Sequence, residues 1–169
     1  LNAWVLAARH PHLVRALVLV DQGADTASRR TQEDFRRWFA TWPVPFPSLW
    51  DVRAFFQGPR PGRAEFFMEI MAEGPDGWRP RLQFEHMLQS CADWDARSYW
   101  DELRQVRCPT LIVRGAESWM PKAELEEMAR IVPGARFVEI PDARHLVHLE
   151  QPVAWRVVVE RFLDDLPSP

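Results

Sequence analysis

The sequence has 169 residues, of which 47% are hydrophobic and 27% are charged. This composition suits one globular domain with a hydrophobic core, or part of one, and excludes a disordered chain. The 21 basic and 24 acidic residues give a formal net charge of −3. Because the basic residues are interspersed with acidic ones, we expect neither a nucleic acid nor a membrane as partner.

Two cysteines, Cys91 and Cys108, are too few for a disulfide framework and lack the spacing of a metal site. We expect both to be buried or unreactive thiols. Every apolar run is shorter than the roughly 20 residues of a membrane span, and the first residues lack the pattern of a signal peptide. These features predict a cytoplasmic protein.

The first predicted elements are a helix and a strand. Residues 1–9 are rich in helix formers and place apolar side chains on one face, and His10-Pro11 ends this helix because a residue before proline avoids the helical conformation. Residues 16–20 are continuously apolar, which is typical of a strand buried on both faces, and Asp21 begins the turn that follows. The helix begins at the first residue without a capping residue, which favours a natural chain that continues upstream.

The middle of the chain has a different composition. Residues 24 to about 100 contain two proline-rich or glycine-rich breaks, at 43–47 and 58–62, and amphipathic stretches at 65–73 and 82–88. They also hold six tryptophans, which are expected to pack and together to line an apolar pocket: Trp38, Trp42, Trp50, Trp78, Trp94 and Trp100. We predict a helical insertion over 25–100 between two core segments, 1–24 and 101–169.

The last third of the chain alternates strands with helices. Residues 110–113 form a predicted strand closed by Gly115, a helix follows over 121–131, a second strand over 136–140 and a final helix over 152–163. Such alternation is typical of right-handed βαβ units. The fold class predicted from the residues is therefore α/β with a parallel sheet, flanking helices and a helical insertion.

The most informative motif for chemistry follows the strand over 136–140. No serine has a Gly-x-Ser-x-Gly environment, and the sequence contains neither a glycine-rich phosphate loop nor His-Glu-x-x-His. His145, by contrast, comes just beyond the carboxyl end of a parallel strand, where ligands of α/β proteins bind. Imidazole is also the side chain suited to general base catalysis near neutral pH, so we interpret His145 as a candidate base and His148 as structural.

Residues 141–152, with His145 followed by an apolar pair and His-Leu-Glu-Gln-Pro, resemble the histidine loop of the α/β-hydrolase superfamily. Residues 108–115 resemble the strand before the acid loop of that superfamily, and residues 1–21 resemble the helix after its nucleophile elbow together with the next strand. These pieces cover both ends of the chain in the family's order, and the insertion would be the cap. The resemblance implies the C-terminal portion of such a fold, starting just after the elbow.

The resemblance implies a serine-type hydrolase of carboxylic esters or related acyl bonds, acting on a small molecule of apolar character without a cofactor. The nucleophile would lie upstream of residue 1, so this chain alone would be inactive. The family usually has an aspartate where this sequence has Ser118. Glu117, the nearest carboxylate, is therefore the first candidate for the acid that orients His145, and Asp21 is the second because some members take their acid from that strand.

Two other functions stay open at this point. One is a binding or receptor module that leaves the triad unused, and the other is haloalkane dehalogenase or epoxide hydrolase chemistry with an aspartate nucleophile. The strand over 16–20 would lie beside the missing elbow strand, which predicts self-association of the isolated chain through an unpaired sheet edge. Lys122 is the only lysine among 21 basic residues, and this arginine bias, with the resemblance, favours a bacterial source.

Overall fold

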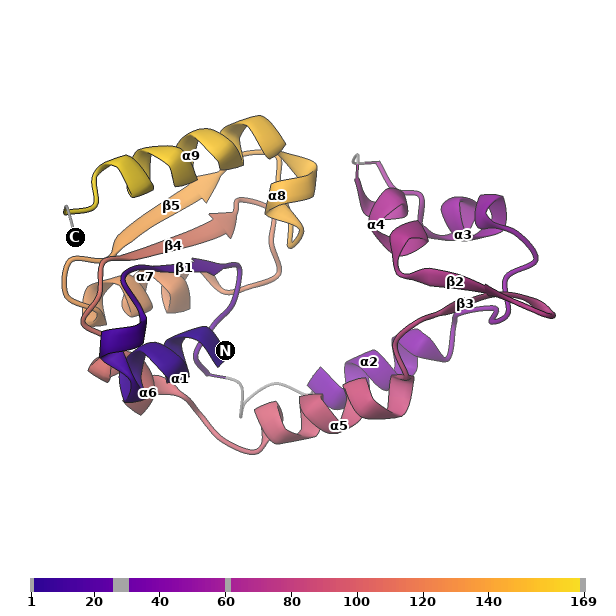
Figure 1. Ribbon diagram of the computed structural model, residues 1–169, viewed down its shortest axis with the longest axis horizontal. Coiled ribbons are helices and arrows are strands. Elements are labelled where there is room, and N and C mark those ends of the chain that lie inside the picture. Colours follow the sequence, from indigo (N-terminus) through magenta and orange to yellow (C-terminus); the bar gives the residue numbers. More distant parts are fainter. Residues whose placement is uncertain (1, 26–30, 60–61, 168–169) are drawn as a thin grey trace. The chain divides into compact units, whose positions relative to one another are not determined.

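The computed structural model describes residues 2–25, 31–59 and 62–167 (Figure 1). Leu1 and part of the predicted break over 58–62 lie outside the described residues. The chain forms two compact units: unit 1 comprises Leu1–Asp25 and Ser98–Pro169, and unit 2 comprises Thr26–Arg97. The division lies close to the predicted boundaries after residues 24 and 100.

Unit 1 is built on a three-stranded parallel sheet in the order β1-β4-β5. The strands are β1 (Leu17–Val20), β4 (Thr110–Gly115) and β5 (Arg136–Ile140). β4 is central and buried along its whole length, which agrees with the apolar residues Leu111, Ile112 and Val113 at its middle. The predicted α/β class with a parallel sheet is confirmed, and all carboxyl ends of the strands meet at one edge of the sheet.

Helices cover both faces of this sheet (Figure 1). α1 (Asn2–Arg9), α6 (Trp100–Gln105) and α7 (Lys122–Ile131) pack on one face over a core that includes Leu19, Ile112 and Met128. α8 (Val147–Glu150) and α9 (Pro152–Asp164) pack on the other face over a core that includes Val113 and Phe162. Alternate residues of each strand therefore point to opposite faces of the sheet and pack into the two cores. The short 3-10 turn η1 (Pro11–Leu13) connects α1 to β1.

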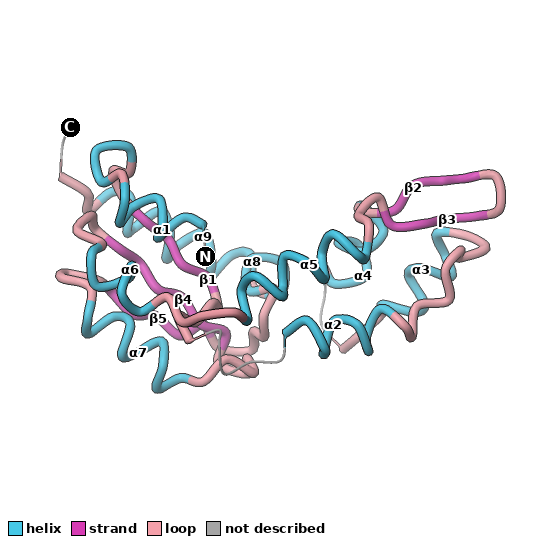
Figure 2. The backbone as a smooth tube through the Cα atoms, turned by 90° about the horizontal axis from the view of Figure 1, so that it is seen from below, coloured by secondary structure: helices cyan, strands magenta, loops and turns pink. Residues whose placement is uncertain are grey.

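The described part of unit 2, residues 31–59 and 62–97, forms four helices and a two-stranded hairpin. Figure 2 shows these elements in order along the chain. α2 (Thr31–Phe39) packs against α5 (Phe84–Asp95), and α3 (Leu49–Phe56) packs against α4 (Arg63–Glu69). Most of the insertion is helical, as expected, and its side chains form a separate core that is rich in aromatic residues.

The amphipathic helical stretch predicted over 65–73 is correct for residues 65–69, which lie in α4, and wrong for residues 71–73, which lie in the hairpin of β2 (Met71–Gly74) and β3 (Gly77–Pro80). Its two-residue connection lies between two glycines, and Gly77 has a φ of +128°, which other residues rarely adopt. A Cβ at Gly77 would also collide with the backbone of Phe46, whose N–H and C=O pair with Trp78 at 2.9 and 2.7 Å. The turn between Gly74 and Gly77 therefore reverses the chain directly after β2 and pairs it with β3.

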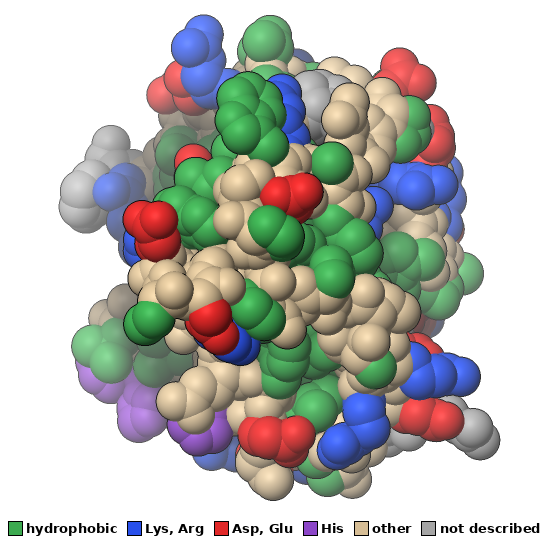
Figure 3. All heavy atoms as spheres, turned by 90° about the vertical axis from the view of Figure 1, so that its right-hand side faces the viewer, with side chains coloured by type: hydrophobic (Ala, Val, Ile, Leu, Met, Phe, Trp, Pro, Cys, Tyr) green, Lys and Arg blue, Asp and Glu red, His purple; other side chains and the backbone are tan. Residues whose placement is uncertain are grey.

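The six tryptophans do not form one group. Trp38, Trp42 and Trp78 belong to the aromatic core of unit 2, whereas Trp50 is 75% exposed and Trp100 lies in α6 of unit 1. On the surface drawn in Figure 3, acidic and basic side chains are scattered among hydrophobic and other side chains. Among the described residues, the helices are all too short or too polar to cross a bilayer.

Candidate functional site

Asp21 occupies the carboxyl end of β1, in a backbone conformation that fixes its direction. Its φ is +49°, a left-handed conformation that aspartate tolerates better than most residues. Its N–H continues the ladder by donating to the carbonyl of Val113 at 2.7 Å, and the residue is completely buried. The buried carboxylate therefore projects from the edge where β1 and β4 end.

His145 lies in the loop between β5 and α8, residues 141–146. This loop crosses directly over Gly115, where a Cβ would collide with the carbonyl oxygens of Ala143 and Arg144. The N–H of Glu117 donates to the carbonyl of Ala143 at 2.9 Å, and the buried Glu150 accepts from the N–H of Arg144 at 2.7 Å. Contacts on both sides of residue 145 thus hold the imidazole at the sheet edge.

The imidazole and the carboxylate are in direct contact. His145 Nδ1 lies 2.9 Å from Asp21 Oδ2, and the histidine side chain remains 45% exposed. Ser118 Oγ lies 2.5 Å from the same Oδ2, and the N–H of Gly115 donates to Oδ1 at 3.3 Å. Because the carboxylate is surrounded by donors, it accepts from His145 Nδ1–H, which leaves the Nε2 lone pair free. This tautomer is the one that a general base requires.

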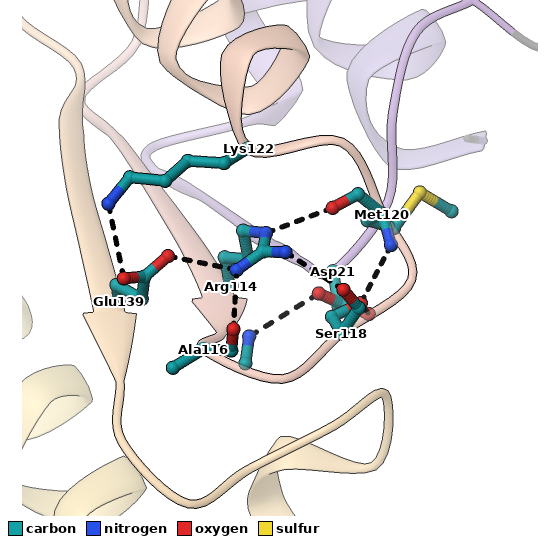
Figure 4. Close-up of polar contacts among 8 residues, drawn as sticks. Asp21, Arg114, Ala116, Ser118, Met120, Lys122 and Glu139 are labelled. Atoms are coloured by element: carbon teal, nitrogen blue, oxygen red, sulfur yellow. Dashed lines mark hydrogen bonds and ion pairs between the residues drawn. The ribbon is translucent and has the colours of Figure 1, made fainter.

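Arg114 fixes the loop between β4 and α7, residues 116–121, whose residues lie around its guanidinium (Figure 4). Its guanidinium donates to the carbonyls of Ala116, Ser118 and Met120 at 3.0, 2.8 and 2.9 Å. It also donates to Glu139 Oε2 at 2.9 Å. One arginine therefore satisfies three carbonyls of this loop, and its own charge is balanced by the β5 carboxylate of Glu139.

Glu139 is shared between Arg114 and Lys122, whose ammonium lies 3.1 Å from Oε1 (Figure 4). Partial burial of the carboxyl raises its pKa, but the hydrogen bonds from Lys122 and Arg114 outweigh burial and hold the pKa below its usual value. The carboxylate of Glu139 is thus ionised at neutral pH and forms ion pairs with both Arg114 and Lys122.

A sequence profile described as the alpha/beta hydrolase family matches residues 2–157, nearly the whole chain. The chain belongs to the alpha/beta hydrolase family. Its sheet edge, with an imidazole after one strand and a carboxylate after another, agrees with that membership.

Relatives of this hydrolase family member were found by sequence and by structure. It is 31% identical over 71 residues to a putative 2-succinyl-6-hydroxy-2,4-cyclohexadiene-1-carboxylate synthase of Bacillus subtilis. The matched region covers 41% of this chain and 25% of that protein. It is 28% identical over 92 residues to the mouse serine hydrolase BPHL, covering 47% of this chain and 32% of that protein.

In structure, the chain resembles E-2-(acetamidomethylene)succinate hydrolase with a TM-score of 0.83 and 24% identity. That match covers 96% of this chain and 62% of the solved chain. At this identity the likeness supports the fold alone. The chain thus spans a quarter to a third of the two curated relatives and less than two thirds of the solved hydrolase.

The two carboxylates that the sequence offered as partners of His145, Glu117 and Asp21, differ in their contacts with that histidine. Asp21, ranked second, makes the contact, whereas Glu117, ranked first, has an exposed side chain and supports the histidine loop through its backbone N–H. The reason is direction: the β4–α7 loop turns residue 117 outward and residue 118 inward. The signal that could have favoured Asp21 is its place directly after the buried strand β1, at the same edge of the sheet as His145.

Other candidates lie around this site or away from it. The ring of Trp119, 65% exposed, lies 5.3 Å from that of His145. Cys91 is completely buried in α5, and this burial, with the nearby Asp95, raises its pKa to about 11, which keeps the thiol protonated. His148 lies on α8, with its ring 6.3 Å from that of Trp155.

Proposed function

We propose that this chain supplies the general base and its orienting acid to a serine-type hydrolase of carboxylic esters or related acyl bonds. The observation that carries the proposal is the 2.9 Å contact between His145 Nδ1 and Asp21 Oδ2 at the carboxyl edge of a parallel sheet. A buried carboxylate behind a half-exposed imidazole is the arrangement that prepares a histidine to accept a proton. Membership of the alpha/beta hydrolase family supports the same reaction class.

In this mechanism His145 Nε2 takes the proton of a serine hydroxyl as the oxygen attacks the acyl carbon. Asp21 keeps the proton on Nδ1 and stabilises the imidazolium that forms. His145 then gives its new proton to the leaving group, and in the second half of the reaction it activates water against the acyl-enzyme. We place the serine in residues that precede Leu1 in the complete protein, so residues 1–169 alone would not turn over substrate.

We further propose that unit 2 is the cap segment of this hydrolase and that the substrate is a small molecule with an apolar part. The N–H of Tyr99 donates to the carbonyl of Ala24 at 3.0 Å, so both ends of the insertion are joined a few residues beyond Asp21. The insertion is therefore connected to unit 1 through the segment that follows Asp21 in the chain. The exposed indole of Trp119 beside His145 offers an apolar contact to a substrate.

The test is ester hydrolysis by the complete protein, with p-nitrophenyl esters of short and long acids as substrates. His145→Ala and Asp21→Asn are each expected to lower kcat by roughly three to four orders of magnitude. His148→Ala, an exposed histidine on the next helix, is the matched control and should keep wild-type turnover. Full turnover by His145→Ala would refute the proposed role of this histidine.

A further inference from the structure

Ser118 contacts the same carboxylate oxygen as the histidine. Its Oγ lies 2.5 Å from Asp21 Oδ2 and accepts the N–H of Met120 at 3.0 Å, and the residue is only 8% exposed. A backbone N–H can only donate, so the single hydroxyl proton of Ser118 is left for the carboxylate. The serine is therefore a donor of defined direction, aimed at Oδ2.

The backbone that carries Ser118 is held as firmly as its side chain. Arg114 donates to the carbonyl of Ser118 at 2.8 Å and to the carbonyl of Met120 at 2.9 Å. The N–H of Ser118 donates to the carbonyl of Gly115 at 2.9 Å. Since these bonds surround residue 118 on both sides, the hydroxyl has little freedom to leave Asp21.

The two oxygens of Asp21 are held unequally. Oδ1 accepts from the N–H of Gly115 at 3.3 Å, which is long for a hydrogen bond, whereas Oδ2 has the short contact to Ser118. Without the hydroxyl, the buried carboxylate would be held by that long contact and by His145 alone. It would then be free to rotate about its Cβ–Cγ bond and turn Oδ2 away from the imidazole.

We infer that Ser118 is a positioning residue, which holds Asp21 Oδ2 in line with His145 Nδ1 and so fixes the imidazole for proton transfer. This inference rests on the proposed function, because it gives Ser118 a role through Asp21 and none in contact with the substrate. In this protein the loop after β4 supplies the hydroxyl, and the turn after β1 supplies the carboxylate.

The inference predicts a specific kinetic pattern in the complete protein. Ser118→Ala should lower kcat about ten- to a hundredfold with KM unchanged, because the variant loses a hydrogen bond to a charged group. Ser118→Thr keeps the hydroxyl and should retain kcat within about threefold. Thr110→Val is the matched control: it removes a fully buried hydroxyl at the other end of β4 and should leave kcat and KM unchanged.

A double-mutant cycle distinguishes positioning from a merely structural role. In an Asp21→Asn background, Ser118→Ala should change kcat by less than about twofold, because the group through which it acts is gone. The Nδ1–H proton resonance of His145 supplies a second readout that needs no turnover: it should shift in Ser118→Ala and stay in place in Thr110→Val. Wild-type kcat in Ser118→Ala, an equal loss of kcat in both backgrounds, or an unmoved resonance would each overturn the inference.

The proposed function and this inference fail in different ways. If His145→Ala and Asp21→Asn keep full turnover, the base and acid roles are refuted together with the role of Ser118. If those two variants lose turnover and Ser118→Ala does not, the base and acid roles stand and only the inference for Ser118 fails.

Discussion

The two units of this protein are stabilised in different ways. In unit 2 the rings of Trp42, Phe56 and Phe67 pack with centroids 4.0 to 5.6 Å apart, around a core made almost entirely of side chains without charge. Unit 1 has aliphatic cores on both faces of its sheet, yet it also buries Asp21 and Arg114 where the strands end.

The difference between the two units shows which kind of interaction can fix the direction of a side chain. Aromatic packing fills volume and tolerates rearrangement, since dispersion and hydrophobic burial have little directional preference. A buried carboxylate is costly unless every oxygen finds a donor, and this requirement selects one arrangement of the surrounding loops. The unit that holds the candidate site therefore buries its directional polar contacts. In the described part of the other unit, polar contacts such as Gln32 N–H to Asp95 Oδ2, at 2.9 Å, involve side chains that are only partly buried or exposed.

The largest effect is expected at the open edge of unit 1. Among the described residues β1 pairs with β4 alone, and apolar side chains of α9 such as Val153 and Val157 are 74% and 55% exposed. The 169-residue chain, produced alone, should therefore self-associate, because an unpaired strand edge and bare apolar surface attract further copies. Sedimentation velocity measures this, and a monodisperse monomer would contradict it.

A proline variant locates that association on β1. The N–H groups of Leu17 and Asp21 donate to the carbonyl oxygens of Pro109 and Val113, which lie in or next to β4. Because successive N–H groups of a strand point in opposite directions, the N–H of Val18 points toward the open edge. Val18→Pro should weaken self-association while keeping the ladder to β4, since a proline on an edge strand removes only the outward donor. Leu19→Pro, which removes a donor toward β4, should instead unfold the sheet.

Removal of one ring from the aromatic core should destabilise unit 2 strongly. Phe56 is 2% exposed and stacks on Phe67 at 4.0 Å, so Phe56→Ala leaves a cavity and should cost about 3–5 kcal/mol of unfolding free energy. Urea denaturation followed by tryptophan fluorescence measures the loss. Phe55→Ala is the matched control, because its side chain is 40% exposed and should cost less than half as much.

A single methyl group at Gly115 tests the contact between the two loops of the site. Gly115→Ala should destabilise unit 1 by about 1–3 kcal/mol. The added Cβ would collide with the backbone carbonyls of Ala143 and Arg144, so the histidine loop would have to shift. The variant should also displace His145 from Asp21 and lower kcat in the complete protein. Gly58→Ala has room for its methyl group and should change neither quantity.

The smallest effect is expected at Glu139. Its pKa is lower in the folded protein than its ordinary value of 4.5, so the ion pairs with Arg114 and Lys122 stabilise the fold above that pH. This contribution should disappear as the pH falls through the lowered pKa, because the folded state then takes up the proton. Its size should stay below about 1 kcal/mol, since the side chain is 28% exposed.

The Glu139→Gln variant isolates that contribution. Unfolding free energies measured between about pH 3 and pH 6 should depend less steeply on pH in Glu139→Gln than in the wild type. Glu160→Gln, whose partner Arg156 lies 3.5 Å away on an exposed face of α9, is the control and should keep the wild-type slope. An unchanged slope in Glu139→Gln would show that the pair contributes nothing measurable.

Local patterns were sufficient to predict most elements of unit 1. The strand predicted over 136–140 is β5, and the helices predicted over 121–131 and 152–163 differ from α7 and α9 by one residue at an end. Proline and glycine mark these boundaries, and continuous apolar runs mark buried strands. The β2–β3 hairpin was missed because β2 follows α4 almost directly, and the apolar spacing over 65–73 also fits a helix.

By itself, the sequence determined the α/β class, the presence of an insertion and the position of His145 at the end of a strand. Only the tertiary structure decided which carboxylate faces that histidine. Asp21 and His145 are 124 residues apart, and the choice between Asp21 and Glu117 depends on the backbone direction after β1 and after β4. Residue spacing carries no information on that direction, because it arises from hydrogen bonds between loops that meet only when the sheet has formed.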